Sequence, residues 1–413
     1  MGLPILFFFA ALTAKQNQTP LRAGCDAEDR VVASLPAGTP VEIRFRLADG
    51  SDCFKVAATV DGKELTGYVP SALLSGTDQY DRQRAAARSV ETARAMNPVV
   101  AQTKELAART SDPTVARAID LIQSNQPKQA LVVLEPLVKR NSRNPDLLLL
   151  TGLAAYRSDQ VRSALDYWKQ SLDLAPNEAL AALYEHARTE SDSDRSGTKL
   201  YGLHIDLRYE GQNLPAETAR AVLSVLDQEF TRISNQLGCS AEEPIVAIVQ
   251  SRDAYLRSTG AAEWSGGQYD GRIHVSWMDG STISAQTRKM LAHELVHACL
   301  TNLAAGKARW PAWLQEGMAQ KLTGDVISPN DRIQLAELAE GHQLPHLDSL
   351  RQNWSRLSAQ NAKLAYALAL AAVDLMYEHY SAYGIRNILN NPEILPQITS
   401  DLDHKLSVMT SGL

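Results

Sequence analysis

Residues 293–300 read "HELVHACL": two histidines stand four positions apart, a glutamate follows the first, and a cysteine comes two residues after the second. In the surrounding segment 284–303, apolar residues recur at every fourth position, which predicts a helix. That apolar face consists of Leu291, Leu295, Cys299 and Leu303. His293 and His297 therefore lie one turn apart on the other side of the helix. Because Cys299 belongs to the apolar face, a metal site that combines it with the histidines is geometrically poor.

Two imidazoles one helical turn apart can bind a single Zn²⁺, and a glutamate beside the first can reach a water on that metal. The alternative is a helix whose His293 and His297 are merely solvated. A zinc site of this kind needs a third protein ligand. The segment "WPAWLQEGMAQ" supplies Glu316, with 18 residues between it and His297. A second helix can return this carboxylate to the metal, which leaves an open position for water.

Taken together, "HELVH", "WLQEG" and the spacing between them resemble the gluzincin metallopeptidases, and the upstream "SRDAYLRSTGAAEWSGGQYDGRIHV" resembles the bacterial peptidase-MA-like domain. The resemblance is good over residues 245–325 and weak over the rest of 200–413. It implies an α+β zincin-like domain at 200–345 with a helical C-terminal part at 346–413. It also implies one zinc ion per chain, with Glu294 as the general base for hydrolysis of peptide bonds. The implied zinc ligands are His293, His297 and Glu316.

The same resemblance implies further roles around this centre. Many relatives carry an acidic group one turn after the ligand glutamate; here Gln320 stands there and can still hydrogen-bond a histidine. Tyr366 falls where relatives often have a helix tyrosine that stabilises the oxyanion, although it can equally be a core aromatic. The strand that begins at residue 272 is expected to line the cleft and pair with an extended peptide, or else to be an ordinary hairpin strand. Its cleft residues are Arg272, Ile273, His274 and Val275.

Residues 145–178 carry a pattern of small and large residues that resembles a tetratricopeptide repeat, with a weaker copy one period earlier. The matching positions are Leu148, Gly152, Ala164, Trp168 and Pro176. The resemblance implies helical repeats over 113–190. The Ala-, Arg- and Gln-rich segment 78–112 is expected to be a helical linker before them, and the polar segment 191–199 a linker after them. Such repeats imply a protein partner, and a helical spacer is the alternative.

Short strands between turn signals fill residues 20–76, with a hairpin turn at Asp61-Gly62. With "GYVPSALL" as its closing segment, this region resembles the bacterial Src-homology-3-like β-barrel. Cys25 and Cys53 fall within it and form the natural disulfide pair, or else remain two buried thiols. Cys299 can in the same way pair with Cys239 or remain a core thiol.

Residues 1–14 fit a secretory signal peptide, because the apolar run from Leu3 to Leu12 is about ten residues long, too short to span a bilayer. Ala14 fits the cleavage point; a mis-annotated start or an apolar tail is the alternative. Arg22 and the polar segment before it argue against a lipoprotein cleavage box that ends at Cys25. The sequence thus predicts an exported protein, periplasmic or extracellular, without a membrane span.

A net charge of −6, with no run of Lys and Arg, gives no support for a nucleic-acid partner. The predicted fold class is multidomain: a small all-β barrel, α-helical tetratricopeptide repeats, and an α+β zincin-like catalytic domain with a helical C-terminal part. The leading function is a zinc-dependent peptidase that acts on peptide or protein substrates. The alternatives are a peptide-binding scaffold or pseudopeptidase, and a zinc hydrolase of another amide.

Overall fold

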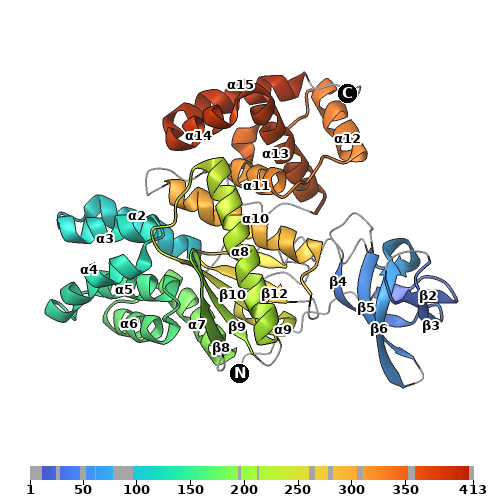
Figure 1. Cartoon of the computed structure of the whole chain (residues 1–413), viewed down its shortest axis with the longest axis horizontal. Helices are drawn as coiled ribbons and strands as arrows, with labels where there is room; N and C mark the ends of the chain where they lie inside the picture. The colour runs from blue at the N-terminus through green and yellow to red at the C-terminus, as the bar shows by residue number, and fades with distance from the viewer. Residues whose placement is uncertain are drawn as a thin grey trace. The chain divides into compact units, whose positions relative to one another are not determined.

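The chain forms two compact units in the computed structural model (Figure 1). One consists mainly of residues 1–89, and its described part is mostly β-strand, while the other contains most of the remaining chain and is mostly helical. This confirms the predicted multidomain organisation with an N-terminal β part at this coarse level. The structure describes residues 12–24, 28–46, 53–60, 62–77, 96–193, 197–211, 214–259, 266–277, 282–304, 310–351 and 359–408.

The N-terminal unit is a curled antiparallel sheet, a half-barrel with strand order β3-β2-β6-β5-β4-β1-β7. Leu21, Leu35, Phe54 and Val69 are fully buried in its core. Gly62 has a φ of 76° between β5 and β6, in agreement with the predicted hairpin turn. The strands are β1 (Leu12–Ala14), β2 (Thr19–Arg22), β3 (Val31–Leu35), β4 (Pro40–Arg46), β5 (Cys53–Val60), β6 (Lys63–Pro70) and β7 (Leu74–Ser75).

Strand β1 comes from residues that the sequence assigns to a signal peptide. Leu12 and Ala14 are buried, and β1 pairs with both β4 and β7. The sheet therefore begins before the predicted boundary at residue 20, and cleavage after Ala14 would remove one of its strands. Residues 1–11 lie outside the described part of the chain.

The second unit begins with a series of helices joined by short turns. Pro113 and Pro145 stand at the first positions of two of them, where the side chains of Asp112 and Asn144 accept hydrogen bonds from backbone N–H groups. Trp168 is fully buried, and its ring nitrogen donates to the Leu149 carbonyl at 3.2 Å. The helices are α2 (Met96–Arg109), α3 (Pro113–Gln123), α4 (Pro127–Arg140), α5 (Pro145–Arg157), α6 (Val161–Leu174) and α7 (Glu178–Ser193).

Regular structure extends into the segments predicted as linkers. Helix α2 lies within the predicted linker 78–112, whose first part, 78–95, is outside the described residues. Helix α7 continues to Ser193, and the next strand starts at Gly197, so helix and strand enter the predicted polar linker 191–199. The reason is that Glu190 in the last part of α7 is buried and ion-paired, which holds this end of the helix in place.

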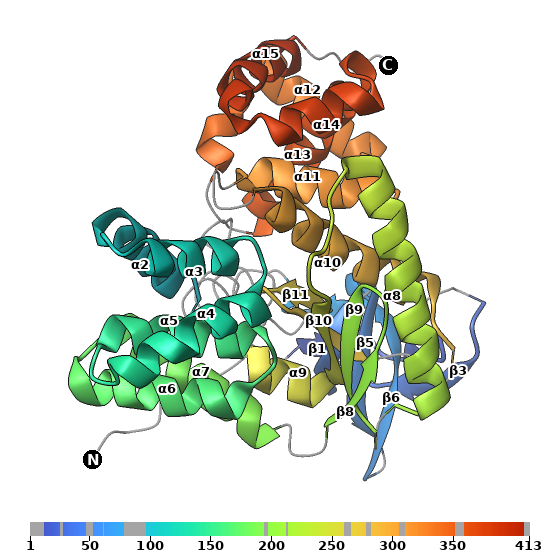
Figure 2. The same cartoon turned by 60° about the vertical axis from the view of Figure 1, so that its left-hand side comes forward.

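A five-stranded sheet follows, with strand order β11-β12-β10-β9-β8. Strands β9, β10 and β12 run parallel, and β8 and β11 pair antiparallel at the two edges. Helix α8 (Ala216–Leu237) packs on one face and α9 (Arg252–Thr259) lies on the other (Figure 2). The strands are β8 (Gly197–Tyr201), β9 (Ile205–Glu210), β10 (Ile245–Ser251), β11 (Gly267–Tyr269) and β12 (Ile273–Trp277).

The described residues that follow β12 form helices. Helix α10 packs against α8 and contacts β11 and β12, and α11 packs against α10. No helix among the described residues is both long and apolar enough to cross a membrane. The helices are α10 (Ala285–Ala304), α11 (Ala312–Leu322), α12 (Pro329–Glu340), α13 (Ala359–His379), α14 (Ala382–Asn390) and α15 (Leu395–Ser407), with 3₁₀ turns η2 (Leu347–Leu350) and η4 (Pro392–Ile394).

A disulfide joins Cys239, just after α8, to Cys299 on α10. Their Cα atoms are 5.5 Å apart, and both residues are buried. Of the two possibilities that the sequence leaves open for Cys299, pairing with Cys239 is confirmed. The predicted pair of Cys25 and Cys53 stays a prediction, because Cys25 lies outside the described residues; Cys53 itself is buried.

The helices α2–α7 and the sheet are joined by polar contacts at the start of α4. Glu243, in the loop before β10, accepts hydrogen bonds from the backbone N–H groups of Lys128 and Gln129 at 2.8 and 2.7 Å. The Lys128 ammonium also pairs with Asp206 on β9 at 2.8 Å. Because N–H groups in the first turn of a helix lack intrahelical partners, Glu243 serves as a cap supplied by another part of the fold.

Candidate metal centre

Helices α10 and α11 bring together the three residues predicted to bind zinc. The Nε2 atom of His293 lies 3.5 Å from one oxygen of Glu316, and Nε2 of His297 lies 3.8 Å from the other. All three potential ligand atoms lie within 4.8 Å of one another, and the three side chains are half-buried. Zinc bonds of about 2.0–2.2 Å to nitrogen and oxygen imply ligand separations of about 3.3 Å, so small side-chain adjustments suffice to hold the metal.

The chemistry of this group fits zinc. Two imidazoles and one carboxylate form a common three-ligand set of catalytic zinc sites, which keep a fourth position open for water or substrate. The rings of His293 and His297 lie edge to face, with centroids 4.9 Å apart, as expected for one helical turn of separation. Partial exposure leaves the group reachable from solvent.

The turn from α10 to α11 is fixed by hydrogen bonds around a tryptophan. The indole N–H of Trp310 donates to the Leu300 carbonyl near the end of α10 at 2.8 Å. The Gln315 side chain in turn donates to the Trp310 carbonyl at 2.8 Å. These bonds hold the start of α11, just before Glu316, near the C-terminal end of α10.

Gly317, directly after Glu316, allows α11 to lie very close to α13. A Cβ atom added at Gly317 would be 2.4 Å from the Ala369 carbonyl oxygen and 2.6 Å from a methyl group of Val373. Contacts this short do not occur between real atoms, so only glycine fits here. The glycine of the "WLQEG" segment therefore sets the distance between the two helices.

Replacing Gly317 with alanine is expected to lower the free energy of unfolding by about 1–3 kcal/mol, because the helices must separate. Alanine is the better helix former by about 1 kcal/mol, so helix propensity alone predicts that the variant is more stable than the wild type. Equilibrium unfolding in urea shows whether the free energy of unfolding falls or rises. A variant as stable as the wild type would contradict the close packing of α11 on α13.

The Gln320 amide nitrogen donates to the backbone carbonyls of Tyr366 at 3.0 Å and Glu316 at 3.3 Å. The role predicted for its side-chain oxygen, as acceptor of a hydrogen bond from a histidine, stays a prediction. The side chain thus joins α11 to α13. Tyr366 is half-buried on α13, and its role in stabilising an oxyanion stays a prediction.

The surroundings of the group do not shift the pKa values of its members in the same direction. Burial raises the pKa of Glu294 to about 7, with a further increase from the negative charge of Glu316 and a decrease from His293. Burial lowers the pKa of His297 to about 4. For His293 burial also acts downward, but the hydrogen bond and negative charge of Glu316 outweigh it and raise the pKa. His297 is therefore held as the neutral imidazole that metal binding requires.

The prediction that the strand from residue 272 pairs with a substrate is wrong. Strand β12 lies between β11 and β10 and is paired on both sides, so it has no free edge. Its four predicted cleft residues are also fully buried: Arg272, Ile273, His274 and Val275. The sheet edge beside the candidate metal centre is instead the short strand β11.

Two glycines bring β11 against α10. A Cβ atom at Gly267 would be 2.8 Å from a carboxylate oxygen of Glu294, and one at Gly266 would be 2.4 Å from the sulfur of Met290. The backbone of the edge strand therefore lies directly beside the predicted general base. The available signal was the Gly-Gly pair itself, because glycine within a strand often marks close approach of another group.

Comparison of the chain with models of known protein families and with curated proteins finds no match.

Proposed function

We propose that this chain is a zinc-dependent metallopeptidase whose centre is formed by α10 and α11. The observation that carries the proposal is the half-buried group of His293, His297 and Glu316, with the buried Glu294 next to it on α10 and beside a sheet edge. A purely structural zinc site needs four protein ligands, whereas the described residues supply three to this group, His293, His297 and Glu316, which leaves a fourth position for water. A binding scaffold has no need of a carboxylate placed next to the group.

When bound, zinc supplies Lewis-acid polarisation of the scissile carbonyl and lowers the pKa of a water molecule. His293, His297 and Glu316 would hold it. The Glu294 carboxylate is then placed to accept a proton from the attacking water and to donate it to the amine nitrogen of the leaving group. The buried setting of Glu294 also excludes other water from this proton transfer.

An extended peptide would pair with β11, the edge strand beside Glu294. Main-chain hydrogen bonds to a sheet edge recognise peptides without regard to their side chains, and pockets beside the strand supply specificity. Gly266 and Gly267 keep this edge close to α10, so a peptide on the edge would lie beside the candidate centre.

The disulfide supports the proposal that the protein is exported. Buried disulfides persist in oxidising compartments such as the periplasm and the extracellular space, and are rare in reducing ones. This agrees with the apolar run at residues 3–12. The protein partner expected for helices α2–α7 stays a prediction.

Zinc binding tests the assignment of the centre. The purified protein is expected to bind one zinc equivalent. Loss of a residue that hydrogen-bonds a zinc ligand typically weakens zinc affinity by about 10–100-fold. His293→Ala removes a ligand itself, so we expect it to weaken zinc affinity by more than this. His346→Ala is the matched control, because that imidazole is largely exposed and outside the group. Competitive titration with a zinc chelator measures all three proteins. A His293→Ala variant that holds a full equivalent with unchanged affinity would overturn the assignment.

A further inference from the structure

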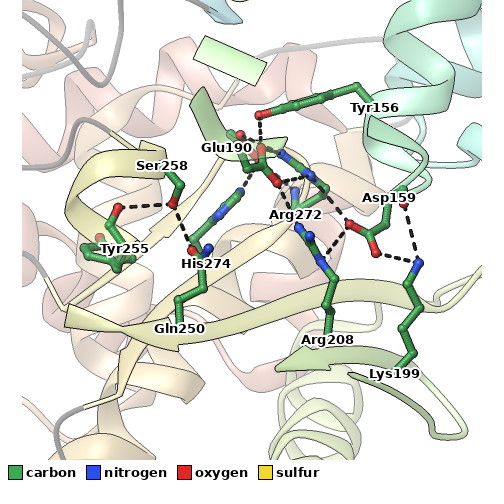
Figure 3. A network of polar contacts seen from close by, with 11 residues as sticks. Tyr156, Asp159, Glu190, Lys199, Arg208, Gln250, Tyr255, Ser258, Arg272 and His274 are labelled. Atoms are coloured by element: carbon green, nitrogen blue, oxygen red, sulfur yellow. Dashed lines mark hydrogen bonds and ion pairs between the residues drawn. The ribbon is translucent and has the colours of Figure 1, made fainter. Parts of the chain in front are cut away.

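A fully buried ion pair joins the helices α2–α7 to the sheet. Glu190 on α7 accepts two hydrogen bonds from the guanidinium of Arg272, the residue just before β12, with N–O distances of 2.9 and 2.8 Å (Figure 3). Neither residue is exposed to solvent. Two parallel bonds of this kind fix the orientation of both side chains as well as their distance.

Neighbouring side chains make further contacts with both members of this pair. Glu190 also accepts hydrogen bonds from the hydroxyl of Tyr156 at 3.0 Å and from Arg208 on β9 at 2.8 Å. The Arg272 guanidinium lies over the Tyr156 ring, 3.7 Å from its centroid (Figure 3). Burial by itself raises the pKa of Glu190, but the charge and hydrogen bonds of Arg272 outweigh it and hold the pKa well below its usual range. The carboxylate is therefore ionised at neutral pH.

The helices also contact the turn between β11 and β12. The backbone N–H of Arg272 donates to the Asp270 carboxylate at 3.1 Å, which closes this turn. Gly271, with a φ of 106°, lies so close to α5 that a Cβ atom there would be 2.9 Å from the Arg157 side chain. Helices α5 and α7 thus hold the turn of the hairpin from which β11 extends.

At its other end, β11 lies against the candidate centre. Gly267 is the residue whose Cβ atom would meet the Glu294 carboxylate at 2.8 Å. A continuous set of contacts therefore leads from Glu190 on α7, through Arg272 and the hairpin, to Glu294 on α10. A hairpin whose edge strand has three residues has few bonds of its own to fix its place.

We propose that Glu190 is a positioning residue: by fixing Arg272, it places the β11 edge strand against Glu294, and helices α2–α7 thereby form part of the peptidase centre. This inference rests on the proposed function. It assigns to the helical segment a role in hydrolysis in addition to any partner that it binds. Displacement of α7 moves the edge on which the peptide is bound, and so lowers turnover without removing a zinc ligand.

Glu190→Gln tests the proposal, with Glu243→Gln as the matched control. Both substitutions remove one buried carboxylate that joins the helices to the sheet, but Glu243 bonds to the start of α4 and does not contact Arg272. Hydrogen–deuterium exchange of residues 266–277 is measured on full-length proteins. We expect exchange to accelerate about tenfold or more in Glu190→Gln and to stay unchanged there in the control.

Hydrolysis and zinc affinity supply the second readout. In Glu190→Gln we expect kcat to fall about tenfold or more because the peptide-binding edge is misplaced, while zinc affinity stays within about twofold of the wild type. If Glu190→Gln does not fold, Tyr156→Phe takes its place, since it removes one hydrogen bond to Glu190 and keeps the ring beneath Arg272. For it we expect about threefold faster exchange at residues 266–277.

Three results would overturn the proposal: unchanged exchange at 266–277 in the Glu190 variant, equal acceleration in both glutamine variants, or lost turnover caused by lost zinc. Where Tyr156→Phe is the variant used, unchanged exchange overturns it equally. A wild-type protein that binds zinc but hydrolyses no peptide refutes the proposed function instead. In that case faster exchange in the Glu190 variant would still show the hairpin to be positioned from α7, with no consequence for catalysis.

Discussion

Glu294→Gln is expected to lower kcat for peptide hydrolysis by about 10²–10⁴-fold, which is the usual contribution of a general base and acid. The amide has nearly the shape of the carboxylate but cannot take up and pass on a proton. His293, His297 and Glu316 are unchanged, so the variant is expected to bind one zinc equivalent. Steady-state kinetics on a peptide substrate and a zinc titration on the same preparation check both parts of the prediction.

Glu337→Gln on α12 is the control, because that carboxylate is exposed and outside the candidate centre. It is expected to leave both kcat and zinc binding unchanged. Wild-type turnover in the Glu294 variant would show that this residue is not the general base. A wild-type protein with a full zinc equivalent and no hydrolysis across a broad peptide library would instead favour the peptide-binding scaffold.

The candidate ligands could be predicted because their arrangement depends mainly on local helix geometry. Any helix over residues 285–304 puts His293 and His297 on one side, whatever packs against it. The position of Glu316 is harder to predict, because this residue lies on a second helix that must pack against the first. The spacing to "WLQEG" indicates that return, but the contacts that enforce it, from Trp310 and Gly317, depend on partners far along the chain.

The edge of the sheet could not be predicted in the same way. The alternation in β12 indicates a strand but not which strands lie beside it, and β11 has only three residues. Strand order is a tertiary property, and the Gly-Gly pair signals the close approach of another group without indicating which group that is. Glu190 was harder still, because its partner Arg272 is 82 residues away and its polar neighbours suggest a solvated linker.

Removing the Cys239–Cys299 disulfide is expected to cost about 4 kcal/mol of unfolding free energy, because the bond closes a long loop and restricts the unfolded chain. The two cysteines are separated by 60 residues, and the loop between them contains β10, β12 and most of α10. The double variant Cys239→Ala/Cys299→Ala isolates this effect, since alanine places no unpaired hydroxyl in the core as serine would.

Urea unfolding of the double variant and of the oxidised wild type measures the difference. Wild-type protein unfolded and refolded in the presence of a reductant is the control, and it is expected to match the double variant within about 1 kcal/mol. Both cysteines are buried, so a reductant added to the folded protein is expected to act only after unfolding.

Cys299 stands two residues after His297, so this bond also fixes the end of the helix that carries a candidate ligand. A double variant as stable as the oxidised wild type would show that the packing of α10 against α8 and the sheet holds this helix without the bond.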